Sequence, residues 1–536
     1  MLSKGGGIRT RLDALSSPGG LFVSAVMAIA CLPVTGVIRD PDFWWHLRAG
    51  QLILAGKALL ATDPFTYTVS THHWTMHEWL TEALFALMHA AGGLGLIVLV
   101  LSALTWFGIV WILLRARLRK PNLFVLGTGL LLAVVAGYPI WGPRAQMITF
   151  AFSCLLLLLV ERHLVRGGRL IWLLVPLFLL WSNLHSGFII GLGFIAVVIA
   201  AEFAGSRLGL PDGAPGSRVK TLLFVLVACA AVAMINPNGP AILVYAFQTQ
   251  GSAAQQSLIL EWHSPDFHDW EVRAFELMLL SVAALVVANR RLRARDAALL
   301  VVATALALQS VRHIALFVAA VTPIWIDQAD MFVRRVHRPA RQRRRTPAPL
   351  RFRVVTFSAV VLVIAGYYAG GRLIPDMRTQ ESSLAYARQF PVCATRWLAA
   401  ARQPLHIFNQ YGEGGYLAYR LSAQGDRVFI FGDAALMGDA MLQTYGNVEG
   451  VQPDWDSIIR KAGSDIVLFD TDTPLADVMQ TSPGWVKVYQ DPMSVAFVPT
   501  SKVRSLQLPA VQAAYAPGDP CQQELALTTS SSQAGG

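Results

Sequence analysis

Apolar stretches recur along the first 370 residues of the chain, and most charged residues stand between them. A helix needs about 20 apolar residues to cross the hydrocarbon core of a bilayer, or somewhat fewer at the short limit. Eleven stretches are candidate spans, at roughly residues 21–38, 93–114, 122–138, 147–165, 170–182, 187–204, 219–235, 273–289, 296–310, 313–326 and 354–371. The pattern predicts an α-helical polytopic membrane protein with about eleven transmembrane helices.

Basic clusters between these stretches indicate the orientation. They precede the first span and follow the second, fourth, sixth, eighth and tenth, so threading the spans in order puts every cluster on one face. Cytoplasmic loops carry such an excess of Lys and Arg. The clusters begin with Lys4, Arg9 and Arg11 and end with nine arginines between Arg334 and Arg353. We therefore expect a multi-pass protein of the bacterial inner membrane, with a cytoplasmic amino terminus and an extracytoplasmic carboxyl-terminal domain.

The pattern changes after residue 375, where short apolar runs alternate with amphipathic segments. It predicts strands at 405–409, 428–432 and 465–470 and helices at 435–445, 454–462 and 474–481. Gly412-Glu413-Gly414-Gly415 has Leu417 where a dinucleotide loop has its third glycine, which favours a turn before a helix. We expect a membrane domain at 1–375 with an amphipathic first outer loop at 39–92, a small extracytoplasmic α/β domain at 376–510 and a disordered tail at 511–536.

Composition and charge exclude other classes. Hydrophobic residues make up 54% of the 536 residues and charged residues 14%, whereas soluble chains carry roughly a quarter charged residues. A soluble enzyme, a disordered protein and a disulfide scaffold are thereby excluded. Residues 376–536 hold 16 acidic and 11 basic residues, so the net charge of +11 comes from the membrane part. Topology explains this excess, and we expect a lipid bilayer as partner but no nucleic acid.

Two of the five cysteines, Cys393 and Cys521, fall in the predicted outer domain, where oxidation is permitted. A disulfide between them would close a loop of well over a hundred residues, worth about 4–5 kcal/mol from lost chain entropy. Because Cys521 stands near the end of the chain, the sequence leaves this pairing open. No CxxC pair occurs, which excludes zinc held by such thiolate pairs.

Polar residues are costly inside a bilayer, so their clusters mark candidate sites. In this topology they gather outside. The first outer loop carries Asp40, Asp42, His46, His77 and Glu78, and later outer segments carry Arg144, Asn183, His185, Asn236, Arg312 and His313.

The chemistry of these groups leaves alternatives open. Asp40 and Asp42, shielded by neighbouring tryptophans, suit a general base or a divalent cation, or they cap a helix. His77-Glu78 lacks the second histidine of an HExxH zinc motif, but Asp40, Asp42, His77 and Glu78 could still bind a divalent cation. Alternatively, these loop residues contact substrate or form an interfacial belt. His46, His72, His73 and His185 are further candidate ligands.

Candidate cations and amides lie further along the chain. Arg144 and Arg312 suit phosphate recognition, or pairing with a loop carboxylate. Asn183 and Asn236 stand where helices meet glycine or proline, as in broken helices that line a cavity, or they form turns.

Four motifs together resemble the GT-C class of integral-membrane glycosyltransferases, which use polyprenyl-phosphate sugars, and in particular a bacterial group of GT-C-like membrane proteins. They are residues 40–45, His77-Glu78-Trp79-Leu80, residues 181–187 and Gly414-Gly415-Tyr416-Leu417. The resemblance covers the layout of the spans and the outline of the tail.

This resemblance implies a function. Asp40 or Asp42 would deprotonate an acceptor hydroxyl, Arg144 and Arg312 would hold the lipid phosphate, and attack opposite that phosphate would invert the anomeric carbon. His46, His77, Glu78 and His185 would orient substrate or bind a cation, and His313, Asn183 and Asn236 would contact substrate. HPP-type and acceptor-sequon signatures are absent, so glycan, lipid and protein acceptors stay open. The alternatives are a transporter or flippase of lipid-linked precursors and a non-catalytic scaffold.

Overall fold

The computed structural model describes residues 17–210, 212–336, 350–379, 386, 389–515 and 519–522. The chain forms two compact units. The helical unit comprises Met1–Gly36, Val98–Ala246 and Leu260–Arg378, and the sheet unit comprises Val37–Ile97, Phe247–Ile259 and Thr379–Gly536. The predicted cluster of Lys4, Arg9 and Arg11, most of the arginine-rich loop and most of the predicted disordered tail lie outside the described residues.

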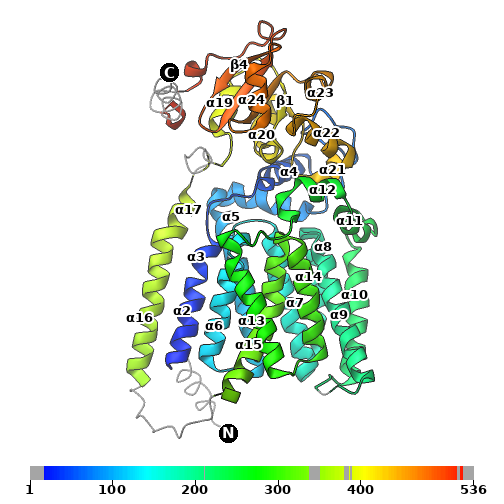
Figure 1. Ribbon diagram of the computed structural model, residues 1–536, viewed down its shortest axis with the longest axis vertical. Helices are drawn as coiled ribbons and strands as arrows, with labels where there is room; N and C mark the ends of the chain where they lie inside the picture. The colour runs from blue at the N-terminus through cyan, green and yellow to red at the C-terminus, as the bar shows by residue number, and fades with distance from the viewer. Residues whose placement is uncertain are drawn as a thin grey trace. The chain divides into compact units, whose positions relative to one another are not determined.

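The helical unit is a bundle in which apolar helices lie side by side (Figure 1). Its helices are α2 (Pro18–Ile29), α3 (Cys31–Val34), most of α5 (Trp79–Ala116), α6 (Leu123–Ala136), α7 (Gln146–Arg166), α8 (Leu174–Leu184), α9 (Phe188–Arg207), α10 (Gly216–Ala233), most of α11 (Ala241–Gln250), α13 (Arg273–Asn289), α14 (Ala294–Gln309), α15 (Ile314–Val336), α16 (Leu350–Tyr368) and α17 (Ile374–Arg378). Every one of the eleven predicted spans coincides with a helix.

Six described helical stretches are long and apolar enough to cross a membrane, and three shorter apolar helices accompany them. The six are Trp79–Arg119, Gln146–Arg166, Phe188–Arg207, Gly216–Ala233, Val311–Val336 and Phe357–Arg378, and the shorter ones are Pro18–Val34, Leu123–Ala136 and Arg169–Leu184. The chain is thus a mostly helical, multi-pass membrane protein with a small sheet, as the sequence predicted. The number of eleven spans stays a prediction.

Arg119, just after α5, holds three other helices of the bundle together through ion pairs. Its guanidinium lies 2.9 Å from Glu161 of α7, 3.0 Å from Asp296 of α14 and 2.9 Å from Asp327 of α15. Glu161 and Asp296 are buried. Since Glu161 is also paired with Arg295 and Asp296 with Arg293, the loss of Arg119 would leave these buried carboxylates with one positive charge fewer.

A second buried arginine extends this network to a fifth helix. Arg295 at the start of α14 lies 3.3 Å from Glu161 and 2.5 Å from Glu202 of α9. Arg115 in the last turn of α5 is also buried and donates to the backbone carbonyls of Ala319 and Ala320 in α15. Arginines that the sequence identified as topology signals therefore also connect α5, α7, α9, α14 and α15.

The sheet unit contains five strands in the order β2-β1-β3-β5-β4. These are β1 (His406–Asn409), β2 (Arg427–Val428), β3 (Ile466–Asp470), β4 (Trp485–Gln490) and β5 (Ser494–Pro499). β1 pairs in parallel with β2 and β3, and β5 pairs antiparallel with β3 and β4. The helices of the unit are α4 (Asp42–Gly56), α12 (Ala253–Leu258), α19 (Val392–Ala399), α20 (Gly414–Leu421), α21 (Ala434–Met437), α22 (Asp439–Glu449), α23 (Trp455–Lys461) and α24 (Pro474–Thr481).

One strand prediction was wrong. The predicted strand at 428–432 ends at Val428, although the Phe429 N–H still donates to the Ile407 carbonyl. The backbone beyond Val428 is also bound by the side chain of Asn409. Its Oδ1 accepts the Phe429 N–H, and its Nδ2 donates to the Ile430 carbonyl. Residues 429–431 therefore leave the sheet as an irregular but buried segment. The β4–β5 hairpin had not been predicted.

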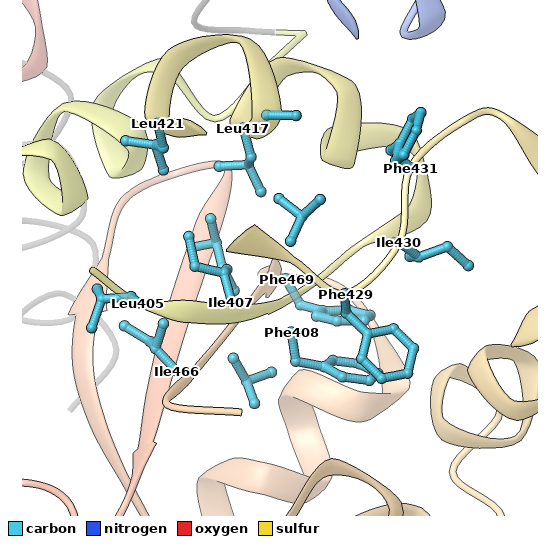
Figure 2. Packing of buried hydrophobic residues seen from close by; sticks show 14 of the residues in the cluster. Leu405, Ile407, Phe408, Leu417, Leu421, Phe429, Ile430, Phe431, Ile466 and Phe469 are labelled. Atoms are coloured by element: carbon cyan, nitrogen blue, oxygen red, sulfur yellow. The ribbon is translucent and has the colours of Figure 1, made fainter. Parts of the chain in front are cut away.

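Hydrophobic side chains of the sheet unit pack on both faces of the sheet. Ile407 of β1 lies on the side of Leu417 and Leu421 of α20, whereas Phe408 packs against Phe429 and Phe469 on the other side (Figure 2). The glycine-rich turn leads directly into α20, as predicted. Cys393 of α19 and Cys521 form a disulfide.

The first loop belongs to this sheet unit. Thr66 forms a parallel bridge with Val428 at the open edge of β2. The Val428 N–H donates to the Phe65 carbonyl, and the Tyr67 N–H donates to the Val428 carbonyl. Backbone pairing therefore joins the loop, which the sequence assigned to the membrane domain, to the carboxyl-terminal sheet.

Replacing Arg119 by Met tests the ion-pair network. We expect a destabilisation of up to about 3–5 kcal/mol, because the buried carboxylates of Glu161 and Asp296 lose one of their two arginine partners. The control is Arg291→Met, whose pair with Asp212 is largely exposed and is worth at most about 1 kcal/mol. Thermal unfolding of the purified protein in detergent measures both, and equal shifts for the two variants would contradict a structural role for the network.

Candidate active site

The two aspartates of the first loop have different roles at the start of α4. Asp40 Oδ1 accepts the backbone N–H of Asp42 at 3.1 Å, so Asp40 caps the first turn. Asp42 Oδ1 instead accepts the indole Nε1–H of Trp45 at 3.2 Å. Both carboxylates are half-buried. The capping interpretation therefore describes Asp40, whereas the side chain of Asp42 is oriented by another side chain.

His46, one turn after Asp42, lies between two buried glutamates. Its Nδ1 is 3.2 Å from Glu82 Oε1 and its Nε2 is 3.6 Å from Glu78 Oε2. Glu78 also lies 3.3 Å from His77 Nε2. His46 and Glu78 are 6% and 5% exposed, and Glu82 only 1%. The structure thus brings His46, His77 and Glu78 together and adds Glu82, which the sequence had not singled out although it stands one helical turn after Glu78.

The pKa values of both histidines in this cluster are raised. Burial lowers the pKa of His46, but the hydrogen bond with Glu82 and the charges of Glu78, Glu82 and Asp42 raise it to about 9. Burial likewise lowers the pKa of His77, and its hydrogen bond with Glu78 and the nearby charges outweigh this and raise it. A protonated imidazole has no lone pair for a metal. Among the residues that the structure describes, no group of three or more His, Cys, Asp or Glu side chains is arranged to hold a metal ion.

The other first-loop histidines lie outside this cluster. His72 Nδ1 lies 3.1 Å from the Leu436 carbonyl, and the exposed His73 forms a bridge with Thr62. Asp433, which sequence reasoning missed, is buried and accepts the Trp74 Nε1–H at 2.7 Å. Its other oxygen caps α21, a position that Gly432-Asp433-Ala434 could have indicated.

Arg144 and Arg312 are in the helical unit and flank Glu261. Arg144 Nη2 lies 2.6 Å and 2.7 Å from the two carboxylate oxygens of Glu261. The guanidinium of Arg312 lies over the ring of Trp262, 5.6 Å from its centre. Burial raises the pKa of Glu261, but the charges of Arg144 and Arg312 outweigh this and lower it. The alternative of pairing with a loop carboxylate thus describes Arg144 in this structure.

Asn183 and Asn236 join two helix ends. Asn183 Nδ2 donates to the carbonyls of Leu179 and Ile235, at 2.8 Å and 3.0 Å. Asn236 Nδ2 donates to the Ser182 carbonyl at 2.9 Å. These contacts satisfy backbone carbonyls where α8 and α10 end, which agrees with the interpretation as turn-forming residues.

His185 and His313 also bind backbone or hydroxyl groups. His185 Nδ1 accepts the Gly187 N–H at 3.0 Å, just before α9, and lies 3.1 Å from the Thr149 hydroxyl. His313 is buried, with Nδ1 3.2 Å from the Leu306 carbonyl. Both imidazoles therefore lie at helix ends of the helical unit.

No protein-family model and no curated protein sequence matches this chain. Solved structures do resemble it. One is the archaeal oligosaccharyltransferase AglB from Archaeoglobus fulgidus in complex with an inhibitory peptide and a dolichol-phosphate, with a TM-score of 0.57 and 10% identity over 87% of this chain and 72% of that one. Another is the apo form of the Archaeoglobus fulgidus oligosaccharyltransferase, with a TM-score of 0.51 and 11% identity over 89% and 74%. These structures are GT-C glycosyltransferases.

The chain has a GT-C-like fold. The expected resemblance to this class is confirmed at the level of the fold. In this GT-C-like chain the candidate residues fall in both units. Asp40, Asp42, His46, His77 and Glu78 belong to the sheet unit, whereas Arg144, Asn183, His185, Asn236, Arg312 and His313 belong to the helical unit.

The charge of His46 predicts a pH dependence of stability. Since its pKa is about 9 in the folded state and about 6.5 in an unfolded chain, its stabilising effect is complete below about pH 6.5 and is lost as the pH rises through 9. The difference amounts to about 3 kcal/mol. Unfolding midpoints between pH 6 and 10 should fall for the wild type and change much less for His46→Gln. The exposed His73→Gln should keep the wild-type slope, and an equal slope in His46→Gln would contradict the assignment.

Proposed function

We propose that this protein is a membrane glycosyltransferase that moves a sugar from a polyprenyl-phosphate donor to a cell-envelope acceptor. The proposal is supported by the GT-C-like fold. The observation that carries it is the half-buried carboxylate of Asp42, oriented by Trp45 and one helical turn from the charged His46. A carboxylate held in this way is suited to accept a proton.

In the proposed reaction Asp42 is the general base. Its carboxylate removes the proton of an acceptor hydroxyl, and the acceptor oxygen forms a bond to the anomeric carbon. The bond between that carbon and the phosphate oxygen breaks at the same time, and the lipid phosphate leaves with its electron pair. Because the attack comes from the side opposite the phosphate, the configuration inverts. The charge of Asp42 is one of those that raise the pKa of the neighbouring His46.

Arg144 and Arg312 are the proposed contacts of the lipid phosphate. A guanidinium binds two oxygens of a phosphate as it binds two of a carboxylate. Arg144 already contacts both oxygens of Glu261, so a phosphate in this place would replace that carboxylate. Arg312 contributes a second charge beside it. The proposed mechanism does not use a divalent cation, since His46 and His77 are paired with glutamates.

The proposed setting is the outer face of a bacterial inner membrane, with a cytoplasmic amino terminus and an extracytoplasmic sheet unit. The acceptor class is an envelope glycan, lipid or protein with a free hydroxyl or amide. Six further residues near the predicted outer loops are proposed to contact substrate: His77, Glu78, Asn183, His185, Asn236 and His313. In the structure their contacts are with other protein groups.

Asp42→Asn tests the proposed base. We expect sugar transfer in membranes to fall by about a hundredfold or more, because a general base contributes roughly that factor. Polyprenyl-phosphate sugar, followed by mass spectrometry, should accumulate. Asp40→Asn is the matched control, since Asn caps a helix about as well as Asp, and it should keep most of the transfer. If neither variant changes donor or product, a transporter or a scaffold becomes the better interpretation.

Glu261→Gln tests the proposed phosphate site. Removing the negative charge of Glu261 weakens its pairing with Arg144, so we expect purified protein to bind undecaprenyl phosphate about tenfold more tightly, as one charge-assisted hydrogen bond is worth roughly that factor. Arg144→Gln should weaken the binding, and Glu276→Gln, whose carboxylate pairs with Arg273, should leave it unchanged. Native mass spectrometry with added lipid measures all three. Unchanged binding in both Glu261→Gln and Arg144→Gln would restrict this pair to a structural role.

A further inference from the structure

The first turn of α4 lies against backbone of the carboxyl-terminal sheet region at places where that region has glycine. Gly432 follows β2, and Gly415 is in the first turn of α20. Both glycines belong to the sheet unit, as do Asp42 and Trp45. These contacts are therefore part of one compact body.

Gly432 leaves no room for a side chain. A Cβ there would meet Asp42 Oδ1, and it would lie 2.7 Å from Asp42 Cγ and 3.2 Å from Trp45 Nε1. Gly432 is not among the glycines with positive φ in the described chain. Any residue could adopt its backbone conformation, so the glycine is required by the space that Asp42 and Trp45 occupy.

Gly415 makes a similar approach to the same turn. A Cβ at Gly415 would lie 2.6 Å from the Pro41 carbonyl oxygen and 3.1 Å from Trp45 Cδ1. Backbone of α20 therefore contacts the residue before α4, while backbone after β2 contacts the carboxylate of Asp42. Two segments far from the first loop in sequence thus fix the start of α4.

The neighbours of Gly432 hold it in this place. The ring of Phe431 packs on Trp45, Phe65 and Trp74, with ring centres 5.5, 5.6 and 6.1 Å apart. Asp433 accepts the Trp74 Nε1–H at 2.7 Å. The labelled side chains Phe429, Ile430 and Phe431 in Figure 2 lie along the segment that leads to Gly432. The segment therefore has little freedom to retreat from α4.

We propose that Gly432 is a positioning residue for Asp42, so that backbone of the carboxyl-terminal sheet region confines this carboxylate against the Trp45 indole. The proposal rests on the proposed function, in which Asp42 is the base. The proposal also gives the carboxyl-terminal region a role in the reaction, because backbone of this region fixes the start of α4 in the first loop. At Gly432 the atom in the way is the end of a side chain, so an added methyl group displaces the Asp42 carboxylate more cheaply than it displaces the backbone.

Gly432→Ala tests this proposal. We expect transfer in membranes to fall about tenfold or more, since a misplacement of about 1 Å can cost on the order of a hundredfold. Gly412→Ala is the matched control, because Gly412 is in the same unit, also lacks a positive φ, and a methyl group added there would meet no atom within 4 Å. It should keep transfer within about twofold of the wild type, as expected for a substitution without new contacts.

Two further measurements separate positioning from a loss of folding. Gly432→Ala should still bind undecaprenyl phosphate and should still form the Cys393–Cys521 disulfide, seen by thiol labelling. Trp45→Phe removes the Nε1–H donor and should lower transfer to a similar degree. Transfer by the double variant, Trp45→Phe with Gly432→Ala, should be no lower than that of the less active single variant, because both changes release the same carboxylate.

The outcomes are distinct. Wild-type transfer in Gly432→Ala would overturn the proposal, and so would loss of the disulfide, which would reduce Gly432 to a folding requirement. If Asp42→Asn keeps full transfer, the assignment of the base fails whatever Gly432→Ala does. If Asp42→Asn loses transfer and Gly432→Ala does not, only the positioning role fails.

Discussion

The close approach between the first turn of α4 and the backbone at Gly415 and Gly432 is the constraint on which the sheet unit depends. Residues 37–97 contain few strands or helices of their own besides α4 and the start of α5. They are ordered by what they pack against. The backbone pairs at Val428, the rings around Phe431 and the bond from Trp74 to Asp433 all join this loop to the sheet. One compact unit is thus assembled from three separate stretches of chain.

The pairing of charged side chains differs between the two units. In the helical unit Arg119, Arg293 and Arg295 pair with four acids, Glu161, Glu202, Asp296 and Asp327. In the sheet unit His46 lies between Glu78 and Glu82, with Asp42 one turn away. Burial lowers the pKa of His46, but the surrounding carboxylates raise it to about 9, whereas burial raises the pKa of Glu82. The helical unit thus pairs arginines with acids between helices, and the sheet unit brings titratable groups together in one cluster.

Much of the fold could be predicted because its signals are local. Apolar runs predicted eleven helical stretches, each of which coincides with a helix, and the apolar runs at β1 and β3 predicted two inner strands of the sheet. The predicted strand at 428–432 was too long, since beyond Val428 the backbone of Phe429 and Ile430 is bound by the Asn409 side chain, 20 residues before Phe429. The β4–β5 hairpin was missed although Asp491-Pro492 marks a turn between two apolar strands.

The candidate site was only partly predictable, since its decisive contacts are not local. The spacing of Asp40 and Asp42 cannot tell which of the two binds the backbone at the start of α4 and which binds the Trp45 indole. The partner of Arg144 is Glu261, 117 residues further along the chain. Glu82 was also missed, but it could have been found from local sequence, because its spacing from Glu78 puts both on one face of a helix.

The same geometry bears on why the first loop and the carboxyl-terminal region occur in one protein. A loop between two membrane helices has too little apolar surface to fix a carboxylate by itself, since ordering each residue costs about 1–2 kcal/mol. Packing of the loop side chains Phe65 and Trp74 against Phe431 supplies additional buried surface. The half-buried Asp42 therefore keeps one orientation, although the loop has little secondary structure of its own. It follows that residues such as Gly432, which contact no substrate in the proposed reaction, are as constrained in size as the proposed base itself.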